Sequence, residues 1–135
     1  MRFKFGHKRT VGGNYQICNV RISDKNGRQK RGYICKFEPF EQIDISSSDK
    51  EVRNSTLKLQ KELISRAADI GIDKFVIHPS AEPIEDARRE EAIKYSMQSL
   101  SELADFAAEN GAVIAVEDLP RSCLGNCADE ILRLI

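Results

Sequence analysis

From residue 43 onward, the chain alternates between short continuous apolar runs and longer stretches with apolar residues at helical spacing. The apolar runs are Lys74–His78 and Ala112–Val116, and another short run, Tyr33–Phe37, precedes them. Their β-branched and aromatic content is typical of strands. The intervening stretches repeat apolar residues every three or four positions, which predicts helices. Strand–helix alternation of this kind indicates parallel strands joined by right-handed crossovers, an α/β fold.

The polar residues between these segments predict where the helices begin and end. Ser48 with Glu51 three positions later forms a capping box, so we expect the first helix to begin there. Gly71 predicts its end. A second helix is expected from about Glu85 to Glu109, before Asn110 and Gly111. Asn126 is expected to cap a third helix, with Asp129 at its third position.

Hydrophobicity within the strands bears on how they are covered. The run Ala112–Val116 is continuous and does not alternate, as expected for a strand covered on both faces. A doubly wound sheet and a βα-barrel both satisfy this pattern, and periodicity alone does not separate them.

Residues 1–36 form a different, atypical segment. They carry ten Lys or Arg and a single acid, Asp24, whereas the whole chain has 21 of each sign. A basic arm for nucleic acid or phosphate is one interpretation. We favour a solvated segment and expect no nucleic-acid partner, since no helical stripe or aromatic platform organises these charges. A β-hairpin is predicted around Asn26-Gly27.

Length and composition limit the remaining possibilities. The chain has 135 residues, enough for one domain, whereas a complete eight-stranded barrel takes about 250. Apolar residues make up 41% and charged residues 31%, an ordinary globular composition. No apolar run is long enough to span a bilayer or to form a signal-peptide core, so we expect a cytoplasmic protein without a membrane partner. The cysteines are expected to be reduced thiols, and Cys123 with Cys127 supplies at most half a metal site.

Two polar side chains follow the buried strands directly. His78 comes after Phe-Val-Ile, and Glu117 comes after Ala-Val-Ile-Ala-Val. In parallel α/β folds, ligands bind and chemistry occurs at the carboxyl ends of the strands. If the two strands are neighbours, about 4.8 Å apart, one imidazole and one carboxylate point into the same space. This pair of donors suits a divalent metal.

Around these residues the sequence resembles a known family. Residues 75–80 (FVIHPS) and 115–121 (AVEDLPR), extended by Cys123–Asn126, are similar to strand-end motifs of the xylose isomerase-like TIM-barrel superfamily. The resemblance covers about residues 38–135. It implies a partial (β/α) TIM barrel, truncated in this chain, with residues 1–36 as a separate N-terminal segment and 37–135 as the barrel domain.

The superfamily includes sugar phosphate isomerases and epimerases. The resemblance implies that Glu117 is a divalent-metal ligand (Mn²⁺, Mg²⁺ or Zn²⁺) and the acid/base that moves a proton beside a sugar carbonyl. It implies that His78 is a metal or substrate ligand. Arg121 is the candidate for an anionic substrate group, and Asn126 opens a helix whose N-terminus can receive a phosphate. The expected substrate is a small sugar or sugar phosphate.

The sequence departs from the family at two points. Phe37 stands where relatives often have a histidine, and a phenylalanine cannot bind metal. Relatives also take further Asp, His and Glu ligands from later strands, so the ligand set here is incomplete. His7 is the only other histidine.

Two alternatives remain open at this point. One keeps the fold but assigns an endonuclease IV-like, metal-dependent phosphodiesterase acting on abasic DNA. Its only distinctive support is the basic N-terminal segment. The other is a non-catalytic half-barrel, which forms a homodimer, binds another partner, or is an inactive fragment; open strand edges favour such association.

Overall fold

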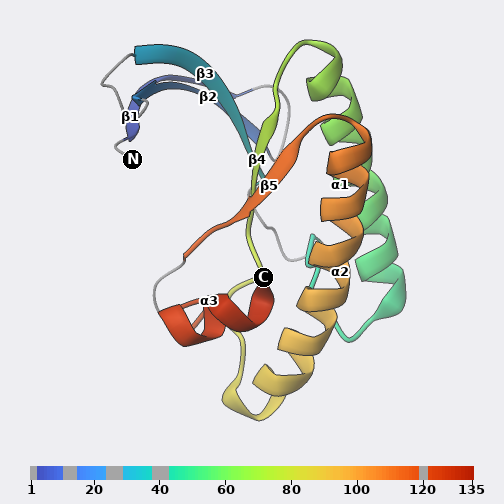
Figure 1. Ribbon diagram of the computed structural model, residues 1–135. Helices are drawn as coiled ribbons and strands as arrows, with labels where there is room; N and C mark the ends of the chain where they lie inside the picture. Colours follow the sequence, from blue (N-terminus) through green and yellow to red (C-terminus); the bar gives the residue numbers. More distant parts are fainter. Residues whose placement is uncertain (1–2, 11–14, 24–28, 38–42, 119–121) are drawn as a thin grey trace.

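A single five-stranded sheet forms the centre of the fold in the computed structural model, with two long helices against one face (Figure 1). The structure describes residues 3–10, 15–23, 29–37, 43–118 and 122–135, the first three of these segments by their backbone. The strands lie in the sheet in the order in which they occur along the chain. The elements are β1 (Phe3–Thr10), β2 (Tyr15–Ser23), β3 (Gln29–Phe37), α1 (Lys50–Asp69), β4 (Lys74–Ile77), a 3₁₀ turn (Asp86–Arg88), α2 (Arg89–Glu109), β5 (Val113–Val116) and α3 (Ala128–Leu134).

The first part of the sheet is antiparallel. β1 pairs with β2, and β2 pairs with β3 from Ser23 opposite Gln29 to Tyr15 opposite Phe37. The predicted hairpin around Asn26-Gly27 is therefore confirmed, with the turn itself outside the described residues. The predicted strand Tyr33–Phe37 is the second half of β3. The boundary expected at residue 36 falls within β3, and the division into two separate segments stays a prediction.

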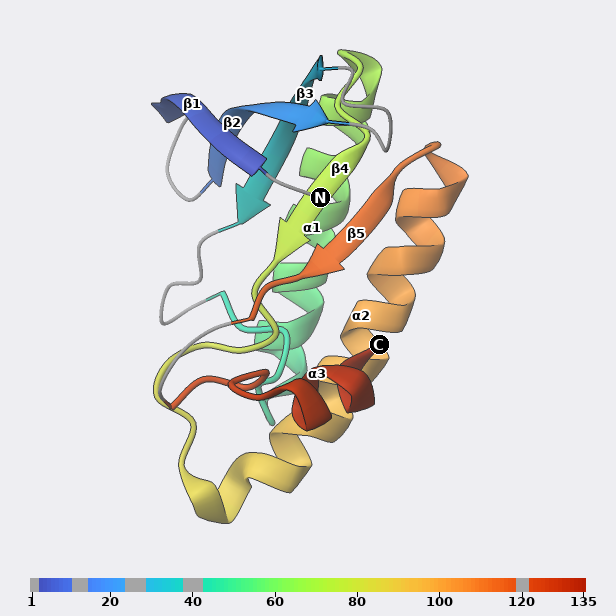
Figure 2. The ribbon, with the colours of Figure 1, turned by 60° about the vertical axis from the view of Figure 1, so that its left-hand side comes forward.

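The second part of the sheet is parallel, as predicted. β3 pairs with β4 through Cys35 and Phe75, and β4 pairs with β5 from Lys74 opposite Val113 to Ile77 opposite Val116. Both crossover helices, α1 and α2, lie on the same side of the sheet (Figures 1 and 2). Right-handed crossovers between strands in sequential order place successive helices on one face, whereas a doubly wound sheet reverses its order and uses both. The arrangement is that of a (β/α) barrel, here a part of one.

Both long helices end where the sequence predicted, but one cap differs. Asp49, not Ser48, is the N-cap of α1, and its Oδ1 accepts a hydrogen bond of 2.8 Å from the Glu51 amide. Two capping residues stand in succession, and the aspartate has the extended backbone that the cap position needs. Gly71 ends the helix with a φ of +85°. The predicted second helix begins with the 3₁₀ turn before α2 and ends at Asn110, followed by Gly111 with φ +69°.

The cap predicted for the third helix is also one residue away from the observed one. Cys127, in an extended conformation, is the N-cap of α3 and its side chain makes no capping hydrogen bond. Asn126 lies outside the helix with an exposed side chain. The asparagine is therefore not the cap that its residue type suggested.

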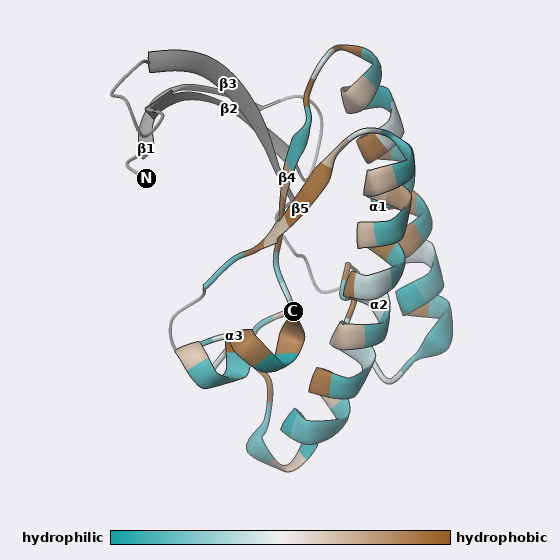
Figure 3. Ribbon diagram, in the orientation of Figure 1, coloured by the Kyte–Doolittle hydropathy of each residue, from teal (hydrophilic) through white to brown (hydrophobic). Residues whose placement is uncertain are grey.

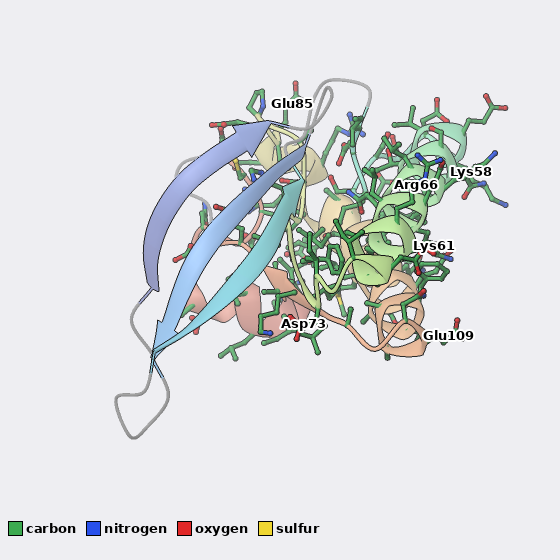
Figure 4. The ribbon with its side chains drawn as sticks, turned by 90° about the horizontal axis from the view of Figure 1, so that it is seen from above. Lys58, Lys61, Arg66, Asp73, Glu85 and Glu109 are labelled. Carbon is green, nitrogen blue, oxygen red and sulfur yellow. The ribbon has the colours of Figure 1, made fainter. Side chains whose placement is uncertain are left out.

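The core lies between the sheet and the helices. Phe75 and Ile77 of β4 are fully buried, as are Ile64 of α1 and Leu103 of α2. Along both helices hydrophobic residues alternate with hydrophilic ones, as expected for helices with one buried face (Figure 3). Outward-facing charges such as those of Lys58 and Arg66 point away from the sheet (Figure 4).

The expectation that β5 is covered on both faces is wrong for the described part of the chain. Ile114 and Val116 are half-buried, whereas Val113 is 60% exposed and Ala115 is also exposed. The physical reason is that both crossover helices cover the same face. Among the described strands β5 also lies at one edge of the sheet.

A largely apolar groove of about 670 Å³ lies beside this edge strand. It is bounded by α2, β5 and α3, with Met97, Leu100, Ala104 and Val116 among the residues that line it. In the described residues, no helix is both long enough and apolar enough to span a membrane.

Candidate functional site

The two strand-end residues singled out by the sequence lie next to each other. Ile77 pairs with Val116, so His78 and Glu117 each follow the last residue of neighbouring parallel strands. The Glu117 amide donates a 3.0 Å hydrogen bond to the Ile77 carbonyl, which carries the pairing one residue beyond the strands. The parallel ladder thus fixes both residues at one edge of the sheet, as the sequence predicted.

The side chains converge as well. His78 Nε2 lies 2.7 Å from Glu117 Oε2, and the two side chains are 11% and 27% exposed. Both of these atoms are buried from solvent. An imidazole nitrogen and a carboxylate oxygen thus meet at a point buried from solvent. Such a pair can share a proton, form an ion pair when the histidine is protonated, or serve as two ligands of one cation.

The segment after His78 is held from two sides. Ser96 of α2 donates a 2.6 Å hydrogen bond to the Pro79 carbonyl. Asp44, in the connection after β3, accepts hydrogen bonds through Oδ1 from the Ser46 amide at 2.8 Å and from the Ala81 amide at 3.2 Å. These bonds fix the backbone that positions the imidazole. Sequence reasoning missed these residues, although an Asp followed two positions later by Ser is a recognisable turn signal.

A charged pair between α2 and α3 was also missed. The carboxylate of Glu130 accepts two hydrogen bonds from Arg89, Nε to Oε1 and Nη2 to Oε2, each 2.8 Å long. The Gly125 amide donates to the same carboxylate at 2.6 Å. Burial raises the pKa of the Glu130 carboxyl. The hydrogen bonds from Arg89 and from the Gly125 and Asn126 backbone lower it by more than burial raises it, so the pKa lies below its ordinary value. No local pattern links two residues 41 positions apart, so the sequence gave no signal for this pair.

The other predicted site residues are not brought to this point. Arg121 lies outside the described residues. Asn126 is exposed just before α3, and its role in substrate binding stays a prediction. Phe37, at the position where a histidine was expected from the resemblance, is the last residue of β3, and β3 pairs with β4.

The fit to a metal is partial. Imidazole and carboxylate are suitable donors for a divalent ion, and His78 and Glu117 supply one of each. Within residues 43–118 and 122–135, whose side chains the structure describes, no group of three or more His, Cys, Asp or Glu side chains gathers. The side chain of Cys123 is buried, and that of Cys127 is exposed. The described residues therefore bring together two suitable donor side chains, whereas a structural zinc site takes four.

Comparison with known proteins agrees with this architecture. The xylose isomerase-like TIM barrel family matches residues 21–135, beginning within β2 and so earlier than the resemblance at residue 38. An uncharacterised protein of Methanocaldococcus jannaschii, MJ1311, is 25% identical over 105 residues, which cover 76% of this chain and 36% of that protein.

Several solved structures share the fold. A D-tagatose 3-epimerase-like protein superimposes with a TM-score of 0.63 at 24% identity, over 72% of this chain and 38% of that one. An L-ribulose 3-epimerase gives 0.62 at 23% identity, over 74% and 35%. The D-psicose 3-epimerase of Clostridium cellulolyticum H10, solved with D-tagatose, gives 0.61 at 18% identity, over 73% and 38%.

The chain thus spans less than two-fifths of the length of each of these proteins. The family nevertheless matches most of this chain's own residues. A (β/α) barrel also accounts for the sequential order of the parallel strands, the helices on one face and the His78–Glu117 pair at the strand ends. The chain belongs to the xylose isomerase-like TIM barrel family.

Proposed function

We propose that this chain is part of a metal-assisted sugar isomerase or epimerase, in which His78 and Glu117 hold a divalent cation and Glu117 also moves a proton. The observation that carries the proposal is the 2.7 Å approach of His78 Nε2 to Glu117 Oε2 at the carboxyl ends of adjacent parallel strands. The fold similarity to sugar 3-epimerases supports the choice of reaction class.

The donor set favours Mn²⁺ or Zn²⁺, which accept imidazole and carboxylate together, while Mg²⁺ prefers oxygen ligands. When bound, such a cation polarises a carbonyl oxygen and stabilises the negative charge that develops there. The ligands beyond these two have to come from outside the described residues. We therefore expect weaker binding by this chain alone than by a complete site.

Glu117 is the residue we assign to proton transfer. Its carboxylate takes the proton from the carbon next to the carbonyl, and the C–H electron pair moves into the bond to the carbonyl carbon to give an enediolate. Return of the proton by the resulting carboxylic acid to the adjacent carbon isomerises the sugar. Epimerisation needs a second acid on the opposite face of the enediolate, because return by Glu117 to the same carbon regenerates the substrate. Glu117 is 27% exposed, so the proton it takes up can exchange with bulk water before it is returned.

The substrate class that fits is a small sugar or sugar phosphate. Arg121 and Asn126 stay the candidates for its polar or anionic groups. The phosphodiesterase alternative predicts cleavage of abasic DNA instead. Assaying sugars and an abasic oligonucleotide in parallel therefore separates the two functions.

The test combines binding and proton exchange. Calorimetry with Mn²⁺, Zn²⁺ and Mg²⁺ compares the chain with its Glu117→Gln and His78→Asn variants. Proton NMR in D₂O then follows loss of the C–H signal next to the carbonyl in a panel of ketoses and sugar phosphates, with an abasic oligonucleotide in parallel. Metal binding that both substitutions abolish, together with exchange that needs Glu117, supports the proposal. A folded chain that neither binds metal nor exchanges the proton contradicts it, and cleavage of the oligonucleotide favours the alternative.

The variant Glu90→Gln is the matched control for these experiments. Glu90 lies on the exposed surface of α2, where it pairs with Arg133 of α3. The substitution makes the same carboxylate-to-amide change away from the strand ends, so metal binding should be retained.

A further inference from the structure

The Arg89–Glu130 pair holds a short loop that approaches the strand ends. Arg89 is 19% exposed and Glu130 is 9% exposed, so the pair is largely shielded from solvent. Beyond their mutual hydrogen bonds, Glu130 accepts from the Gly125 amide and Arg89 donates to the Cys123 carbonyl at 2.8 Å. The pair thus fixes both ends of the loop 123–125.

This loop contacts the backbone next to both candidate ligands. Gly125 has a φ of +74°, and a β-carbon placed on it would lie 3.5 Å from the Glu117 carbonyl oxygen and 3.5 Å from Pro79 Cγ. The neighbouring Leu124 amide donates a 2.9 Å hydrogen bond to Ser80 Oγ, and all of these loop atoms are buried. The loop therefore rests on Glu117 itself and on the two residues after His78.

We infer that Arg89 and Glu130 form a positioning pair, which acts through loop 123–125 to fix the imidazole of His78 against the carboxylate of Glu117. The pair makes hydrogen bonds with the loop, and the loop in turn contacts Glu117, Pro79 and Ser80. The backbone pairing of β4 and β5 ends at Glu117. The alignment of the His78 and Glu117 side chains therefore depends on the residues that pack on the strand ends. Loop 123–125 packs there, in addition to the hydrogen bonds that Ser96 and Asp44 make with the segment after His78, and the charged pair holds the loop in place.

The chain offers a matched control for this inference. A second pair, Arg133–Glu90, also joins α3 to α2 through two hydrogen bonds, of 3.0 and 2.6 Å. Its side chains are 50% and 77% exposed, and its two hydrogen bonds join the helices away from the loop. Glu130→Gln and Glu90→Gln make the same chemical change in two α2–α3 pairs, only one of which holds loop 123–125.

The first readout is independent of metal. The chain contains two histidines, His7 and His78, so imidazole resonances are few and His78→Asn assigns them. In Glu130→Gln we expect the ring resonances of His78 to move and those of His7 to stay, with both unchanged in Glu90→Gln. Far-UV circular dichroism verifies folding, and Arg89→Lys replaces Glu130→Gln if the latter does not fold.

The second readout rests on the proposed function. Substitutions in residues that orient metal ligands weaken affinity by roughly 10- to 100-fold. We expect Mn²⁺ to bind Glu130→Gln about tenfold more weakly than the unmodified chain, and Glu90→Gln to bind it equally well.

The possible outcomes separate the two ideas. Unchanged His78 resonances in folded Glu130→Gln, or equal movement in Glu90→Gln, overturn the inference, whether or not metal binds. If the unmodified chain binds no Mn²⁺, the proposed function fails, and a selective movement of the His78 resonances still supports the positioning pair. If Mn²⁺ binds the unmodified chain and Glu130→Gln equally, the inference fails and the proposed function stands.

Discussion

Replacing Glu130 by alanine removes the acceptor of two hydrogen bonds from Arg89 and of backbone hydrogen bonds from Gly125 and Asn126. The guanidinium that remains is only 19% exposed, so water compensates for the lost carboxylate poorly. Removing one partner of a buried ion pair costs about 3–5 kcal/mol, and because Arg89 keeps some exposure we expect the lower end, about 3 kcal/mol. For a chain of this size that loss lowers the melting temperature by roughly 10 °C.

Urea denaturation followed by far-UV circular dichroism measures this loss, with an unchanged dependence on urea as the sign that the folded state is intact. Glu90→Ala is the control, since its side chain is 77% exposed and its pair with Arg133 is screened by solvent and salt. The reasoning is refuted if Glu130→Ala loses no more stability than Glu90→Ala.

The remaining predictions concern pH, the loop, the core and assembly. The folded-state pKa of Glu130 is lowered from 4.5, so its stabilising effect is present above pH 4.5 and is lost as the pH falls through the folded-state pKa. The difference in unfolding free energy between the unmodified chain and Glu130→Gln should therefore disappear in acid. Gly125→Ala should destabilise by about 1–2 kcal/mol in urea denaturation, since its φ is positive and the new β-carbon would lie 2.7 Å from Ile131 Cδ1. Ser96→Ala should cost about 1–2 kcal/mol in the same assay, because it leaves a buried carbonyl of the loop after β4 without its 2.6 Å hydrogen bond. The homodimer is one of the alternatives left open by the sequence: if the chain pairs through the groove beside β5, light scattering should show a dimer that Met97→Glu shifts to monomer, and a dimer that the substitution leaves intact contradicts that interface.

The candidate site was predictable because its signals are local. A polar residue directly after a buried run marks a strand end, and the parallel pairing implied by strand–helix alternation brings such ends together. His78 and Glu117 followed from these two steps. The hairpin before β3 was likewise signalled by the dipeptide Asn26-Gly27.

The errors arose where local signals compete or where distant parts of the chain decide. Ser48 and Asp49 are both good helix caps, and only the backbone conformation selects the aspartate. Asn126 has the better residue type, yet the chain places Cys127 at the cap. The exposure of Val113 depends on which face the helices cover, which its own neighbours in sequence do not encode.

The supporting network was beyond sequence reasoning for the same reason. Arg89 and Glu130 both lie in helical segments where charged residues are usually solvated. Their meeting depends on how α3 packs on α2, and nothing in either segment alone signals it.

The sequential strand order has a consequence for how the chain folds. Every strand pairs with the strand that comes next in the sequence, from β1 through β5, so no strand has to wait for a distant partner. Each pairing therefore closes only a short loop and loses little chain entropy, first across a hairpin turn and then across a single crossover helix. The sheet can assemble in the order in which its strands are synthesised, with β4 adding to the edge of the β2–β3 hairpin. The His78–Glu117 pair forms only when β5 is added. A nascent chain arrested before β5 should already protect the backbone amides of β3 from exchange while the candidate site is still unmade.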